Sequence, residues 1–395
     1  MREVDFSDRT VARRWREIKP HLREDLVPWT RNMLKHLLET CLEEEIECYL
    51  RASRHERTTD RQDYRNGAYT RDLTTELGCL RGLRVPRART AGFEPQVFAR
   101  YQRRQPGVNQ LLRTAFISGV STRQVGPLTA LLLDEAVSAS TVSRVTQSLG
   151  ADVHRFHTRP LPDRARYLLL DGVRLTVKGP LGARKRVVLC AYGLTPEGAR
   201  ELLAFRQVQA ESEATWAAFL TDLAQRGLLG HSLRLVVTDG HPGLLAALDL
   251  VYPFVRRQRC WVHKLRNVAA KLPRRLHPTC LAEAKAIYAA ASQRAAVAAF
   301  RRWAGRWHGE APKAVACLAQ DLEALLAFFA CPRAHWRKVR TTNAIERAFR
   351  EVRRRTRPMS CFTNAASCDR IIYAVIHHLN TRWGQYPLRE FTQKS

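Results

Sequence analysis

The sequence of 395 residues has no long apolar run, no internal repeat and no low-complexity tract. A membrane-spanning helix needs about 20 consecutive apolar residues, so we expect no integral membrane protein. Residues 1–15 contain no apolar stretch of the kind found in a secretory signal, which predicts a cytoplasmic protein. Because 45% of the residues are hydrophobic and 8% are aromatic, the composition also excludes a disordered polymer and favours two or three globular domains.

Paired cysteines are absent as well. The ten cysteines are scattered along the chain, and no two of them form a C-x2-C pair. Without an export signal, this pattern predicts reduced thiols rather than a disulfide framework.

Acidic residues are few compared with basic ones. The chain carries 66 Lys and Arg against 37 Asp and Glu, a formal net charge of +29. Such an excess repels itself unless a polyanion compensates it, and nucleic acid is the usual polyanionic partner. A ribosome-associated or membrane-surface protein would also be basic. Here the charge is spread through segments with folded patterns and is not confined to a tail, which favours nucleic acid.

The first 155 residues predict a mainly helical region. Residues 1–55 show apolar side chains at helical spacing, which predicts an amphipathic helical segment. Residues 56–155 are predicted to form a DNA-binding region, in which turn formers and short alternating runs up to about residue 105 indicate a small sheet or hairpin. A helix-turn-helix is predicted over about 118–150.

The predicted helix-turn-helix depends on two Ser/Thr-rich helix starts. Ser121 is the expected N-cap of the first helix, which Gly126-Pro127 could break. The second helix would turn Ser140, Thr141 and Arg144 toward a DNA major groove. Many helical hairpins share this pattern, so it fits an ordinary hairpin equally well.

A Pro-containing segment at 156–166 is the expected domain boundary. Beyond it, the apolar runs predict elements in the order β-β-β-α-β-α-β-α, followed by a wholly helical stretch over 273–335. Three adjacent strands and then alternating strands and helices indicate an α/β fold. We expect a ribonuclease-H-like catalytic domain, a mixed sheet flanked by helices, over 160–272 and 336–395, with 273–335 as an all-helical insertion.

Two aspartates follow apolar runs and precede glycine. Asp171 comes directly after Tyr167–Leu170, and Asp239 comes directly after Leu233–Thr238. A carboxylate at the exit of a buried strand is costly unless it has a partner such as a metal ion. Each Asp-Gly alone could be an ordinary turn. The occurrence of both at neighbouring strand ends favours a metal site for phosphoryl transfer.

The third carboxylate is predicted to be Glu346. It lies in a helical segment in which Arg350, Arg353 and Arg357 fall within about 40° of it, separate from an apolar face. This pattern suits a metal ligand beside a DNA backbone, to which Arg354 would also contribute. The alternative is an i,i+4 pair of Glu346 with Arg350 on a solvated helix.

Cys260 and His263 have the spacing of metal ligands, but two ligands do not complete a zinc site. His277 and Cys280 also stand three apart, so the four residues could together bind zinc. We favour the other interpretation, in which His263 is a polar group near the carboxylates and Cys260 is a small buried residue.

Taken together, these segments resemble the Mutator-like family of bacterial insertion-sequence transposases, from about residue 60 to 385. The resemblance is carried by the following motifs: RNGAYTRDL, LRVPRAR, STRQV, SASTVSRV, LLLDGV around Asp171, VVTDGHPGL around Asp239, RCWVHKLRNV around Cys260 and His263, and TTNAIERAFREVRRRTRP around Glu346.

The resemblance implies a DDE transposase with Asp171, Asp239 and Glu346 as its metal-binding triad. Two Mg²⁺ ions, for which Mn²⁺ could substitute, would serve DNA strand cleavage and strand transfer. Cys260 and His263 would be the family's signature near the active site. The N-terminal region would bind the terminal inverted repeats of the element, and the protein would act as a homodimer on double-stranded element and target DNA. It would lie in the bacterial cytoplasm, associated with the nucleoid.

Two other functions fit the same sequence features. A sequence-specific DNA-binding regulator would share the basic charge and the helix-turn-helix. A ribonuclease-H-like nuclease would share the carboxylates but would cut without joining strands.

Overall fold

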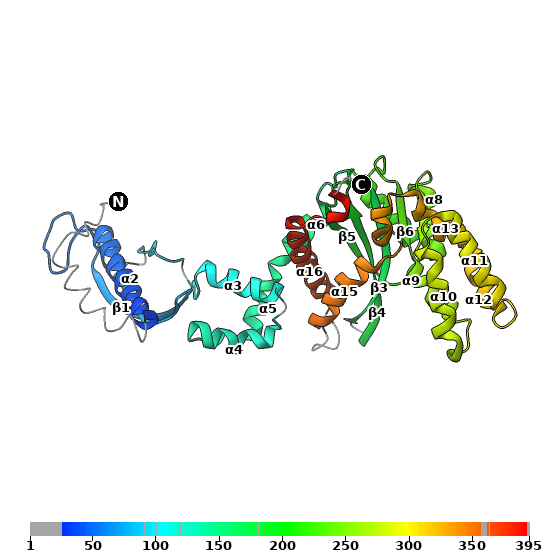
Figure 1. Ribbon diagram of the computed structural model, residues 1–395. Coiled ribbons are helices and arrows are strands. Elements are labelled where there is room, and N and C mark those ends of the chain that lie inside the picture. Colours follow the sequence, from blue (N-terminus) through cyan, green and yellow to red (C-terminus); the bar gives the residue numbers. More distant parts are fainter. Residues whose placement is uncertain are drawn as a thin grey trace. The chain divides into compact units, whose positions relative to one another are not determined.

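A computed structural model gives the fold (Figure 1). It divides into two compact units, residues 1–147 and 148–395, and each is described by itself. The residues that the structure describes are 26–90, 92–99, 101–118, 120–179, 182–356, 362 and 364–392.

The first part of the N-terminal unit is a helix packed on a β-hairpin. Helix α2 (Leu26–Leu50) packs on β2 (Gly78–Ala88), which pairs antiparallel with β1 (Arg65–Thr75). The apolar residues between helix and hairpin are Leu42, Leu73, Leu83, Val85 and Phe98. The predicted small sheet is therefore confirmed. Of the helical segment expected over 1–55, residues 26–50 are helical, whereas 51–55 form turns.

In the described part of this unit, three helices follow the hairpin: α3 (Pro106–Ile117), α4 (Thr122–Leu133) and α5 (Ala139–Gln147). Ser121 caps α4 as predicted, since its hydroxyl accepts a hydrogen bond from the Gln124 backbone N–H in a capping box. The break considered at Gly126-Pro127 does not occur, and α4 runs through both residues. The helix ends at Leu133, and the left-handed backbone of the following Asp134 (φ 55°) turns the chain toward α5.

A mixed five-stranded sheet forms the centre of the second unit. Its order is β5-β4-β3-β6-β7, in which β3, β4 and β5 are antiparallel neighbours and β6 and β7 run parallel to β3. The predicted order of strands and helices is confirmed. The strands are β3 (Tyr167–Gly179), β4 (Gly182–Leu194), β5 (Arg200–Val208), β6 (Leu235–Thr238) and β7 (Arg256–Arg259).

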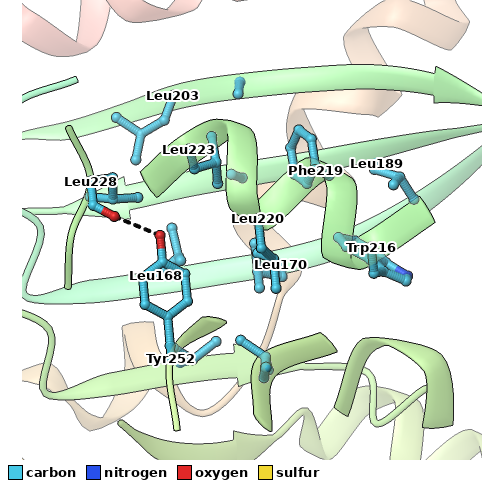
Figure 2. Packing of buried hydrophobic residues seen from close by; sticks show 14 of the residues in the cluster. Leu168, Leu170, Leu189, Leu203, Trp216, Phe219, Leu220, Leu223, Leu228 and Tyr252 are labelled. Atoms are coloured by element: carbon cyan, nitrogen blue, oxygen red, sulfur yellow. Dashed lines mark hydrogen bonds between the residues drawn. The ribbon is translucent and has the colours of Figure 1, made fainter. Parts of the chain in front are cut away.

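Helices cover both faces of this sheet. On one face, α7 (Glu213–Gln225) and α8 (Pro242–Val251) bury Leu168 and Leu170 of β3 (Figure 2). Because side chains alternate along a strand, Leu169 and Asp171 point to the opposite face. That face is covered by α15 (Asn343–Thr356) and α16 (Ala365–Gln385).

The division between the units comes before the predicted boundary at 156–166. Helix α6 (Leu149–Thr158) packs on α16 and β5, and its Phe156 ring stacks on Phe205 at 5.8 Å. The Arg226 guanidinium also donates a hydrogen bond to the Phe156 carbonyl. These contacts make α6 part of the sheet-containing unit.

Most of the segment 273–335 is helical. Tryptophan N–H groups join these helices to each other and to the core, because Trp303 donates to the Cys280 carbonyl and Trp261 donates to the Leu325 carbonyl. No helix in the described ranges is long and apolar enough to cross a membrane. The other α-helices in the described part of the second unit are α9 (Trp261–Ala269), α10 (His277–Ala289), α11 (Gln293–Trp307), α12 (Pro312–Gln320), α13 (Leu322–Leu326), α14 (Trp336–Val339) and α17 (Arg389–Thr392).

Candidate active site

Asp171 lies on β3, and Asp239 directly follows the neighbouring parallel strand β6. Leu169 of β3 is level with Val237 of β6, and each aspartate comes two residues after its member of this pair. Asp239 directly follows β6, as predicted. Asp171 does not end its strand, because β3 continues to Gly179 and remains paired with β4 along its whole length. The prediction of a strand end was wrong because the continuous apolar run stops at Asp171 while the ladder does not.

Asp171 is a buried carboxylate. Its side chain lies on the α15 face of the sheet, and the residue is only 4% exposed. Burial raises the pKa of Asp171 to about 7, and the negative charges of Asp239 and Glu346 act in the same direction. His263 and a hydrogen bond from Thr342 oppose the shift. The three carboxylates predicted from the sequence are therefore close enough to interact electrostatically.

Asp239 lies in a turn at the end of β6, an inner strand of the sheet. Its Oδ1 accepts a hydrogen bond of 2.9 Å from the His241 backbone N–H. Gly240 completes the turn with φ 81°, a conformation that favours glycine. The turn-forming role considered for this Asp-Gly pair is thus present. The turn also holds the carboxylate at the end of β6.

Glu346 is on the first turn of α15 and is held by two cations from α9. Its Oε1 lies 2.9 Å from Arg266 Nη1 and 3.7 Å from His263 Nε2. Helix α15 packs on β3 and β4, which brings this carboxylate to the sheet face that carries Asp171. The i,i+4 pair with Arg350 considered from the sequence is not the ion pair found for this glutamate.

Cys260, His263 and Thr342 link α9 to the start of α15. Thr342 is fully buried, and its backbone N–H and hydroxyl donate to Cys260 Sγ at 3.3 and 3.5 Å. The Thr342 hydroxyl also lies 3.5 Å from His263 Nδ1. Cys260 together with the carboxylates Asp171 and Asp239 raises the pKa of His263 to about 9, against the effect of burial. These neighbours favour the protonated form of His263.

A fourth carboxylate, which the sequence analysis missed, lies beside these groups. Glu211 precedes α7, is mostly buried, and has its Oε2 4.0 Å from His241 Nε2. Burial raises the pKa of Glu211, and the charge of Asp239 adds to the effect. Gly172 makes room for it, because a Cβ there would meet Glu211 Oε1 at 2.2 Å. Nothing in the sequence around Glu211 marks it as a neighbour of the strand ends.

No metal cluster is formed in this arrangement. Among the described residues, no three His, Cys, Asp or Glu side chains come close enough together to hold a metal ion. His277 begins α10 and its Nε2 lies 3.1 Å from the Leu272 carbonyl, while Cys280 is buried in the same helix. The four-residue zinc site considered from the sequence is therefore not assembled.

The residues predicted to contact DNA fall on two helices, one in each unit. On α5, Ser140 and Arg144 are exposed, whereas Thr141 is half-buried and bonded through its hydroxyl to Ser138 at 3.1 Å. Ser143, which the sequence analysis did not single out, shares the exposed face. On α15, the side chains of Arg350, Arg353 and Arg354 are exposed. Arg354 pairs with Glu351 at 3.0 Å. Arg357 lies outside the described residues.

Comparison with known proteins agrees with the family that the motifs suggested. A family model described as "Transposase, Mutator family" matches residues 8–386. The transposase for insertion sequence element ISRM5 of Rhizobium meliloti is 35% identical over 353 residues, 89% of this chain and 88% of that protein. The transposase for insertion sequence element IS256 in transposon Tn4001 of Staphylococcus aureus is 33% identical over 357 residues, 90% of each.

Among solved structures, a chain of the Drosophila P element transposase strand transfer complex matches 72% of this chain and 81% of its own length. The TM-score is 0.28 and the identity is 10%, too low to support a conclusion about fold or function. The family model and the two insertion-sequence relatives each cover most of the sequence. The chain therefore belongs to the Mutator family of transposases.

Proposed function

We propose that this transposase cleaves and joins DNA strands at the ends of an insertion sequence, using Asp171, Asp239 and Glu346 to hold divalent metal ions. The observation that carries the proposal is that Asp171 on β3 and Asp239, directly after β6, follow the ends of two paired parallel segments, beside the sheet face that the helix of Glu346 covers. Strand transfer requires the attacking and the leaving oxygen to be stabilised together, which carboxylate-bound metals do well.

The topology supports a ribonuclease-H-like core. Three antiparallel strands are followed by two strands parallel to the first, and helices lie on both faces. The predominantly helical segment 273–335 falls between the second aspartate and the glutamate, and would be the insertion domain of this core.

The donor set suits Mg²⁺, with Mn²⁺ as a substitute. Carboxylate oxygens are the ligands that Mg²⁺ prefers, and Asp171 is a buried carboxylate whose charge is opposed by neighbouring negative charges. A cation would relieve that repulsion. When bound, two such ions activate the attacking oxygen and stabilise the leaving one. Glu346 would exchange its ion pair with Arg266 for the metal.

The remaining groups position the DNA and the carboxylates. His263 holds Glu346 from one side, and the Thr342 hydroxyl links His263 and Cys260. The exposed arginines of α15, together with Arg357, would bind the phosphates of the reacting strand. The exposed face of α5 would bind the terminal inverted repeats, and pairing of two ends would require a homodimer.

The proposal is tested with Asp171→Asn, Asp239→Asn and Glu346→Gln on DNA carrying the ends of the element. We expect all three variants to lose cleavage and joining with Mg²⁺ or Mn²⁺ while binding the ends nearly as well as the wild type. Asp249→Asn is a control on an exposed carboxylate of α8. Substantial cleavage by any triad variant would refute the assignment. Cleavage without joined products would instead indicate a nuclease.

A further inference from the structure

A cavity of about 580 Å³ adjoins α15, the helix that carries Glu346. It is formed by residues of β4, β5, α9, α10, α15 and α16 with the segment that precedes α15. Ala344, Arg347 and Glu351 line it, and each lies about 100° or more around α15 from Glu346. Its volume is in the range of sites that hold small ligands. The cavity is therefore separate from the carboxylates but adjoins the same helix.

The lining of the cavity is strongly cationic. Its one carboxylate, Glu351, already pairs with Arg354 at 3.0 Å. Thr341 and Asn343 line it at the start of α15, where the helix dipole adds positive potential. The cavity would therefore attract a negatively charged group. The six cationic residues that line it are Arg200, Arg337, Lys338, Arg340, Arg347 and Arg350.

Two half-buried aromatic rings lie among these cations. The ring of Tyr288 has the Arg340 guanidinium 4.5 Å from its centroid, and the buried Trp261 packs 5.0 Å from it. The Trp383 ring has the Arg200 guanidinium at 5.4 Å, and the buried Tyr192 packs at 5.5 Å. Each ring is thus fixed by a cation and a second aromatic.

We propose that this cavity binds one unpaired nucleotide of a DNA strand whose neighbouring phosphate lies at the carboxylates. The base would stack on Tyr288 or Trp383, and its phosphate would contact Arg347 and Arg350. Flat aromatic faces among cations bind bases with little sequence preference, because every base has a stacking face. A paired base is held inside the duplex, so the nucleotide must first leave the stack.

Arg350 connects this cavity to the active site. It lines the cavity, and it lies only about 40° around α15 from Glu346. A strand bound at the carboxylates would follow Arg350 around the helix into the cavity. The inference rests on the proposed function for its substrate, but the binding it describes needs neither metal nor cleavage.

The test compares binding of two probes to the full chain in the Asp171→Asn background with EDTA. One probe is an eight-nucleotide oligothymidylate, and the other is an abasic strand with the same phosphates. We expect about tenfold tighter binding of the oligothymidylate, the size of one stacked base. Tyr288→Leu and Trp383→Leu should reduce this preference while affinity for the abasic strand changes less than about twofold. Tyr288→Phe and Trp383→Phe should keep the preference, because they keep a ring.

The cationic side of the cavity is tested with Arg347→Ala, for which the exposed Arg302→Ala on α11 is the matched control. Arg347→Ala should weaken the binding of both probes to the same extent and lower its salt dependence, whereas Arg302→Ala should change neither. The proposal is overturned if both Leu variants keep the full preference for the oligothymidylate. It is also overturned if their affinities for the oligothymidylate and for the abasic strand fall equally. Because metal is absent, these outcomes are independent of whether the triad cleaves DNA.

Discussion

Replacing Asp171 with Asn should stabilise the metal-free protein while it removes activity. Asp171 is buried beside two other carboxylates, and these surroundings disfavour its charge. Asn has nearly the same shape as Asp, but it has no charge to bury. We therefore predict that the charged Asp171 carboxylate, a proposed metal ligand, lowers the free energy of unfolding of the metal-free protein.

The sign and size follow from the pKa. Burial raises the pKa of Asp171 from 3.8 to about 7, so the folded state holds a proton that the unfolded state releases near pH 4. The contribution of this group to stability is fully present below pH 4 and is lost as the pH rises through 7. Each pH unit in that window costs up to about 1.36 kcal/mol. Between pH 5 and pH 7 the wild type should lose about 2 to 3 kcal/mol more than Asp171→Asn.

The assay is urea unfolding of both proteins at pH 5 and pH 7 with EDTA. Asp249→Asn is the control, because its hydrogen bond with Arg257 lowers the pKa of Asp249 and the surface site should show no such gain. Equal pH dependence of the wild type and Asp171→Asn would show that Asp171 is not held in a charge-disfavouring environment.

Three further predictions concern single side chains. Arg266→Ala removes the cation closest to Glu346, so it should lower the Mg²⁺ concentration needed for half-maximal cleavage; an unchanged or higher requirement would show that Arg266 does not compete with metal. Arg144→Ala on the exposed face of α5 should weaken binding to the element ends and reduce the slope of affinity against salt, and an unchanged slope would place this arginine away from DNA. Ser121→Ala removes the cap of α4 and should lower the free energy of unfolding, measured with urea, by about 1 kcal/mol. Ser121→Asp should keep most of the wild-type stability, because Asp can also cap a helix.

The sequence predicted the order of the elements in the second unit because short apolar runs mark its strands. It did not predict that β3 continues past Asp171, since the outer half of this strand is held by its ladder to β4 and not by a continuous apolar run. The end of β6 at Thr238 and the aspartate that follows it could be predicted from the local sequence pattern alone.

Glu211 and the cavity could not be predicted, because each depends on packing between distant elements. Glu211 approaches Asp239 because the starts of α7 and α8 pack closely, where a Cβ on Gly243 would meet Glu213 N at 2.6 Å. The cavity collects Tyr288 and Trp383 from helices almost a hundred residues apart in the sequence. The pairing of Glu346 with Arg266, rather than Arg350, likewise follows from the contact of α15 with α9.

The most direct test of the proposed metal site is the anomalous scattering of Mn²⁺ in crystals of the full chain bound to an element end. We predict Mn²⁺ between Asp171 and Asp239, with the Glu346 carboxylate as a ligand and no longer paired with Arg266. A DNA complex in which Glu346 stays on Arg266 and no Mn²⁺ lies at the two aspartates would contradict the account.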